Sequence, residues 1–161
     1  ITLALARRDA EVVAADVSAA ALAVAQANAQ ALGANVKWVA SDWYAAIDER
    51  FDLIVSNPPY IAAGDPHLAT LRCEPIDALT DHADGLACLR RIVAGAPAHL
   101  RPGGWLLVEH GCDQGERVRQ LLGDAGLHGV RTVRDLAGHD RVCIARSAAE
   151  PSLHDRTCRS D

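Results

Sequence analysis

The sequence predicts an α/β protein with a doubly wound, mostly parallel sheet whose last strand is antiparallel. Apolar strand-like segments alternate with helix-like segments, and this alternation favours a parallel sheet with helices on both faces. The last two strand candidates, 130–136 and 141–147, are separated by only four residues, which is too few for a crossover and predicts an antiparallel pair. Polar side chains also follow three successive strand candidates, as is typical of the ligand-binding edge of such a sheet.

The composition is typical of one globular domain with its own core. Half of the 161 residues are hydrophobic and 23% are charged. The formal net charge of −5 and the scattered basic residues argue against direct binding to nucleic acid. No apolar run approaches the ~20 residues of a membrane helix, no signal-peptide pattern is visible, and the cysteines have no metal-binding spacing. We therefore expect a cytoplasmic protein that binds no membrane, no metal and no nucleic acid directly. We also expect a monomer, although no feature of the sequence determines the oligomeric state.

The first part of the chain contains two strand candidates with a helix between them. EVVAADV, at 11–17, is a short apolar run rich in valine, with an acid, Asp16, near its end. Such a run is typical of a buried parallel strand. Ser18 offers an N-cap for an alanine-rich helix, and Gly33 should end that helix. VKWVASD, at 36–42, is predicted to be the next strand, with Trp38 in the core.

The middle of the chain combines a clear strand with a long irregular segment. FDLIVSN, at 51–57, is predicted to be the third strand. The segment 61–84 contains prolines and acids without a period, and connections of this length are usually functional or disordered. A helix is expected near 85–100, with Gly95 and Pro97 breaking or kinking its last turns.

The remaining elements complete the alternation. RPGG, at 101–104, predicts a turn, 105–111 a strand with Trp105 in the core, and 114–126 a helix with a glycine stop. The two closing strands come next, with Cys143 expected to be buried and Arg141 expected to form an ion pair across the hairpin. A mostly parallel sheet with a reversed last strand favours the methyltransferase version of the doubly wound fold over the dehydrogenase version.

Three of the predicted strands end in groups suited to a nucleotide-like ligand. Asp16 is placed to accept hydrogen bonds from ribose hydroxyls, or alternatively to cap the turn before the next helix. Asp42 would accept the exocyclic amine of an adenine with Trp43 against its ring, or the two are a loop acid and a packing tryptophan. Asn57 ends the third strand, and the carboxyl ends of parallel strands meet at one edge.

The sharpest local feature is the elbow, defined here as Asn57, Pro58, Pro59 and Tyr60. The prolines lock two φ angles and keep the residues before them extended. The Asn57 side-chain oxygen and the Pro58 backbone oxygen would accept the two N–H groups of a planar amide or aromatic amine, with Tyr60 as a flat face. Such a nitrogen is a poor nucleophile, and two fixed acceptors would position it and favour its developing charge. We predict Asn57, Pro58 and Tyr60 as catalytic residues; a proline-rich turn is the structural alternative.

Together these segments resemble the HemK/PrmC family from the first residue to about Ser147. The family comprises S-adenosylmethionine-dependent methyltransferases that modify the glutamine of the Gly-Gly-Gln motif in bacterial peptide chain release factors. NPPY alone is shared with adenine-N6 DNA methyltransferases and with enzymes acting on a ribosomal protein. The resemblance is first visible in SNPPYI, SDW, AADVS and the EHG that follows RPGGWLL. The more specific evidence is the ordered set DPHL, CEPIDAL, EHG, QGE and HDRV.

The resemblance implies a Rossmann-like class I methyltransferase fold, S-adenosyl-L-methionine as cofactor, and N5-methylation of glutamine in release factors, which act in translation termination. It implies that Asp16 binds the cofactor ribose and that Asp42 and Trp43 flank its adenine. Asn57 would contact the cofactor and, with Pro58, Pro59 and Tyr60, hold the substrate amide. Glu74 and Pro75 match a family stretch without an assigned role.

The sequence also departs from the family pattern. By comparison with the family, a DxGxGxG loop should precede ITLALARRDA, and we expect this loop, a first strand and an N-terminal helical domain to be missing from the chain. In addition, Cys73 stands where an aromatic is usual. We expect 1–149 to be a methyltransferase domain incomplete at its N-terminus and 150–161 to be a polar, disordered tail. Three alternatives stay open: methylation of a ribosomal-protein glutamine, methylation of DNA adenine, or a truncated chain without activity. A DNA enzyme should carry a recognition region and a basic face.

Overall fold

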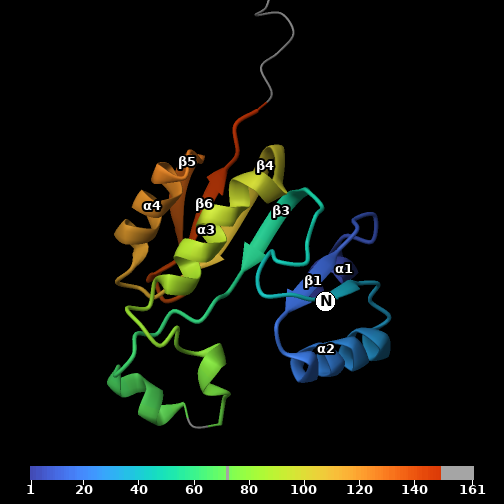
Figure 1. Ribbon diagram of the computed structural model, residues 1–161, viewed down its shortest axis with the longest axis horizontal. Coiled ribbons are helices and arrows are strands. Elements are labelled where there is room, and N and C mark those ends of the chain that lie inside the picture. The colour runs from blue at the N-terminus through green and yellow to red at the C-terminus, as the bar shows by residue number, and fades with distance from the viewer. Residues whose placement is uncertain (72, 150–161) are drawn as a thin grey trace, which may run out of the picture. The chain divides into compact units, whose positions relative to one another are not determined.

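The computed structural model describes residues 1–71 and 73–149 (Figure 1). The chain divides into two compact units, of which the first is Ile1–Glu49 and the second begins at Arg50. Each unit is described by itself. The tail expected at 150–161 lies outside the described residues.

The first unit is a parallel strand pair with an intervening helix. Its elements are α1 (Thr2–Ala6), β1 (Val13–Asp16), α2 (Ala19–Leu32) and β2 (Lys37–Ala40). Ser18 caps α2 as predicted, because its hydroxyl accepts a hydrogen bond from the Ala21 N–H at 3.2 Å. Gly33 ends the helix in the left-handed conformation at φ 67°, where a glycine meets no steric penalty.

The second unit is built on a four-stranded sheet in the order β3-β4-β6-β5. The strands are β3 (Phe51–Ser56), β4 (Leu100–Glu109), β5 (His128–Arg134) and β6 (Asp140–Arg146). β3 and β4 are parallel, whereas β6 runs antiparallel to both β4 and β5. The predicted antiparallel last strand is therefore confirmed, and it lies between two strands of the opposite direction.

Two helices cover one face of this sheet. α3 (Ala87–His99) contacts β4, α4 (Gly115–Asp124) contacts β5 and β6, and the two helices contact each other (Figure 1). Two short 3-10 turns, η1 (Pro66–Thr70) and η2 (Ile76–Ala78), lie within the segment expected to be irregular. The core between helices and sheet is formed by side chains with almost no exposed surface: Leu89, Ile92, Val93, Leu106, Val108, Val118, Leu122 and Cys143. Among the described residues, no helix combines the length and apolar character needed to cross a membrane.

Pro97 lies inside α3 without ending it, since the helix continues to His99. Two local expectations were wrong. RPGG belongs to β4 rather than to a turn, although the register shifts between the pairs Phe51–Leu100 and Leu53–Trp105. Trp105 is 37% exposed because strand alternation places it opposite the buried face; the Arg146 guanidinium lies 5.4 Å from its ring centroid.

Candidate functional site

The structure brings Asp16 and the Asp42–Trp43 segment to the same edge of the β1–β2 sheet. Asp16 pairs with Ala40 in the parallel register, and the backbone oxygen of Asp16 accepts a hydrogen bond from the Ser41 N–H at 3.0 Å. The chain therefore leaves β2 directly beside the end of β1. Asp16 and the Asp42–Trp43 segment therefore share this edge, as expected from the strand assignments.

Asp16 has the turn role that the sequence offered as an alternative. Its side chain is exposed, and one carboxylate oxygen accepts a hydrogen bond from the Ser18 N–H at 2.7 Å, just before α2 begins. A carboxylate has about four acceptor positions, so this bond leaves capacity for a ligand hydroxyl. The turn role and a ligand-binding role are therefore compatible.

Trp43 is held in a conformation that bulky residues rarely adopt. Its φ is 55°, in the left-handed region. The Ser41 hydroxyl is buried and supports this turn, because it donates to the Trp43 backbone oxygen at 2.9 Å and accepts from the Ala46 N–H at 3.0 Å. Strain of this kind is concentrated at functional sites. The supporting role of Ser41 was not predicted, although it is the first residue of the SDW motif.

The elbow begins where β3 ends. Asn57 is exposed, Pro58 is buried, and Pro59 and Tyr60 are half-buried. Its last residue is fixed to the neighbouring strand, because the Tyr60 hydroxyl donates a hydrogen bond to Glu109 Oε1 at 3.1 Å. Burial, followed by this contact with the Glu109 carboxylate, raises the pKa of Tyr60. The phenol is thus a protonated donor at neutral pH.

Gln114 and Gly85, which the sequence did not single out, lie next to the last residue of the elbow. Gln114 Nε2 donates hydrogen bonds to the backbone oxygens of Tyr60, at 2.9 Å, and Gly85, at 3.2 Å. The chain beyond the elbow is also tied down, since the Ile61 N–H donates to the Leu79 oxygen at 3.0 Å. The available sequence signal was the QGE motif for Gln114; nothing in the sequence indicated Gly85.

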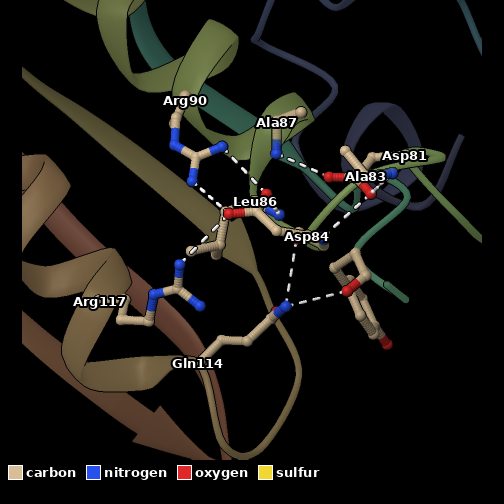
Figure 2. Close-up of polar contacts among 10 residues, drawn as sticks. Asp81, Ala83, Asp84, Leu86, Ala87, Arg90, Gln114 and Arg117 are labelled. Atoms are coloured by element: carbon tan, nitrogen blue, oxygen red, sulfur yellow. Dashed lines mark hydrogen bonds and ion pairs between the residues drawn. The ribbon is translucent and has the colours of Figure 1, made fainter. Parts of the chain in front are cut away.

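The segment that carries Gly85 is organised by two aspartates (Figure 2). Asp81 accepts hydrogen bonds from the N–H groups of Ala83, Gly85 and Ala87, at 2.9, 3.0 and 2.7 Å. Asp84 accepts from Arg90 of α3 at 3.0 and 2.5 Å and from Arg117 of α4 at 3.3 Å. Figure 2 shows both guanidinium groups directed at Asp84 from the two helices. We call this segment, 81–87, the acidic loop.

Acid unfolding is expected to depend on Asp84. Hydrogen bonding to Arg90 and then to the Leu86 N–H lowers its pKa from 3.8 to about 2. The ionised form therefore stabilises the fold above about pH 3.8, and this contribution is lost as pH falls toward 2. An Asp84→Asn variant should be less stable than the parent at neutral pH and should show a shallower loss of stability on acidification, measured by urea unfolding across the range.

Arg90→Gln provides the matched variant for this prediction. It removes the main partner of Asp84 while leaving the carboxyl group in place. The same shallower acid dependence is expected, since the pKa of Asp84 should return toward its ordinary value. Parallel pH profiles for the parent and the two variants would contradict the prediction.

Two other expectations about single residues are confirmed. Cys143 is fully buried, and burial raises the pKa of its thiol. Arg141 forms an ion pair with Asp135 at 3.3 Å across the closing hairpin. Glu74 and Pro75 lie in the irregular segment, where Pro75 precedes η2.

The proteins that this chain resembles in sequence are methyltransferases. A family model described as methyltransferase small domain matches residues 1–72. The chain is 58% identical, over 146 residues, to a release factor glutamine methyltransferase of Bordetella pertussis; the match covers 88% of this chain and 54% of that protein. A protein of the same name from Xylella fastidiosa is 56% identical, with 91% and 54% covered. The chain thus spans about half the length of these relatives.

Solved structures show the fold. A methyltransferase from Pyrococcus furiosus matches 91% of this chain and 68% of its own length, with a TM-score of 0.68 and 18% identity. A 16S rRNA methyltransferase from T. thermophilus, in complex with AdoMet and guanosine, matches 91% of this chain and 34% of its own, with a TM-score of 0.64 and 24% identity. The expected class I methyltransferase fold is therefore confirmed.

Proposed function

Because the chain belongs, over the length that it spans, to the family of release factor glutamine methyltransferases, we propose that a protein carrying it methylates glutamine in release factors. The methyl group would pass from S-adenosyl-L-methionine to the N5 atom of the glutamine in the Gly-Gly-Gln motif. The observation that carries this proposal is the 58% identity over 146 residues to a relative of that name.

The first unit fits the cofactor. The exposed Asp16 carboxylate would accept the ribose hydroxyls, and Asp42 and Trp43 at the same edge would flank the adenine. The strained backbone of Trp43, supported by the buried Ser41 hydroxyl, accords with a ring held in place for stacking. When bound, S-adenosyl-L-methionine supplies an electrophilic methyl group on a sulfonium.

The elbow would prepare the substrate amide. Asn57 Oδ1 and the Pro58 backbone oxygen accept its two N–H groups, so that the nitrogen is oriented and its developing positive charge is stabilised. Asn57 would also border the cofactor. Pro58 and Pro59 keep the acceptors rigid, and Tyr60 offers a ring face whose orientation is fixed by Glu109.

The proton balance follows from the same contacts. The amide nitrogen gains a methyl group and loses one proton, which leaves late to water or to a carbonyl oxygen. Tyr60 does not serve as the base, because burial and its Glu109 contact raise its pKa and keep it protonated. No further base is required.

The proposed substrate defines partner and place. Peptide chain release factors are the protein partners, with no direct nucleic-acid contact and no membrane. The reaction belongs to the bacterial cytoplasm, and a monomer suffices because the proposed site uses residues of one chain.

A transfer assay tests the proposal. The chain, alone and extended by the glycine-rich segment that the family resemblance implies, is incubated with isotope-labelled S-adenosyl-L-methionine and a bacterial release factor. We expect one labelled methyl group on the motif glutamine, located by mass spectrometry, and none on a release factor whose motif glutamine is replaced by alanine. Absence of transfer and of cofactor binding in both proteins would refute the proposal. Parallel reactions with DNA or with ribosomal protein in place of the release factor would refute it if only those acceptors were labelled.

A further inference from the structure

Both ends of the Gln114 side-chain amide form hydrogen bonds, and two of these bonds reach the elbow and the acidic loop. The residue is only 8% exposed. Its Oε1 accepts from the Gly111 N–H at 2.8 Å, while its Nε2 donates to the Tyr60 and Gly85 oxygens at 2.9 and 3.2 Å. Figure 2 shows the two dashed lines that leave the Gln114 nitrogen. Because both partners of Nε2 are carbonyl oxygens, the orientation of the amide is determined by its contacts.

These bonds join segments that are far apart in the sequence. Gln114 stands immediately before α4, yet its side chain makes no capping bond to that helix. It reaches across to the end of the elbow, 54 residues away, and to the acidic loop, 29 residues away. The Nε2 group of Gln114 therefore donates its hydrogen bonds to the elbow and to the acidic loop, and the side chain makes no capping hydrogen bond to α4.

The acidic loop presents a preformed surface to Gln114 and Tyr60. Asp81 collects three of its N–H groups, which fixes the backbone at Gly85. A Cβ atom on Gly85 would lie 2.5 Å from the Tyr60 oxygen and 2.7 Å from Gln114 Nε2. The Tyr60 carbonyl is thus clamped between a backbone surface and a buried amide.

We propose that Gln114 is a positioning residue for methyl transfer: by holding the Tyr60 carbonyl against the acidic loop, it sets the two acceptors of the elbow. This inference rests on the proposed function for its chemical meaning. The Pro58 oxygen is two residues from the clamped carbonyl, and the rigid Pro59 between them transmits any displacement. A misplacement of about 1 Å lowers the rate of such a reaction by up to about 100-fold.

The decisive variant is Gln114→Glu, in the protein used for the transfer assay. It keeps the acceptor for the Gly111 N–H but replaces the two donated hydrogen bonds by an oxygen facing two carbonyl oxygens. We expect kcat to fall about 10- to 100-fold while the KM for S-adenosyl-L-methionine changes less than about twofold. Amide hydrogen exchange at Ile61 and Ala63, just beyond the elbow, should accelerate at least about tenfold.

Gln120→Glu is the matched control. Gln120 is exposed on α4, the helix that begins just after Gln114, so the identical change should leave kcat and the exchange rates at Ile61 and Ala63 within about twofold of the parent. Should Gln114→Glu fail to fold, Gln114→Asn, which shortens the reach of the same amide, is judged by the same two readouts.

The outcomes separate this inference from the proposed function. Unchanged kcat in a folded Gln114 variant overturns the positioning role, whether or not exchange accelerates. A lower kcat with unchanged exchange at Ile61 and Ala63 also overturns it, because the elbow then has not moved. If the unaltered protein neither transfers a methyl group nor binds the cofactor, the proposed function fails, and unchanged exchange in the variant would separately refute the clamp itself.

Discussion

Replacing Asn57 by alanine is expected to lower methyl transfer to the release factor by about 100- to 1000-fold, the usual loss when one fixed partner of a transition state is removed. Asn57 directly follows the last residue of β3 and is exposed. A substrate amide could therefore reach its side chain. Without its oxygen, only the Pro58 carbonyl would hold the substrate nitrogen. That nitrogen would then be free to rotate away from the methyl donor.

The measurement separates turnover from binding. Single-turnover transfer gives the rate loss, and calorimetry with S-adenosyl-L-methionine gives the cofactor affinity, which should weaken much less than turnover falls. Asn35→Ala is the matched control, because Asn35 is an exposed asparagine between α2 and β2 and should leave transfer within about twofold. Unchanged turnover in Asn57→Ala would overturn the role given to the elbow.

Much of the fold could be predicted because its signals are local. Ser18 and Gly33 bound α2 through contacts within one helical turn, so the residue types alone indicate the start and the stop. The closing hairpin is equally local, since the short connection excludes a parallel crossover. Strand alternation also predicts the positions of Asp16 and Asn57, each at or just after the end of a strand.

The contacts that shape the candidate site could not be predicted in this way. The bonds from Gln114 to Tyr60 and Gly85 depend on packing between distant segments, and a motif such as QGE names a residue without naming its partners. The left-handed φ of Trp43 is similar, because the buried Ser41 hydroxyl stabilises a conformation that intrinsic preference disfavours. Sequence patterns therefore indicate which residues belong to the elbow but not what holds it.

Gly85→Ala should be the most destabilising single change near the elbow. At φ +78° the backbone of Gly85 is left-handed, which costs a residue with a Cβ atom about 1–2 kcal/mol. The new Cβ would also lie 2.5 Å from the Tyr60 oxygen, a backbone atom that cannot rotate away. Overpacking of this kind adds about 1–3 kcal/mol, so the free energy of unfolding should fall by about 2–5 kcal/mol in urea unfolding.

Gly126→Ala isolates the collision from the backbone strain. Gly126 has nearly the same φ, +75°, but no atom lies within 4 Å of the position of its Cβ. Only the backbone cost of about 1–2 kcal/mol should therefore appear. The difference between the two variants measures how firmly the Tyr60 carbonyl is held. Equal losses would mean that the elbow yields to the methyl group, and a carbonyl that yields so easily would not fix the acceptors upstream of it.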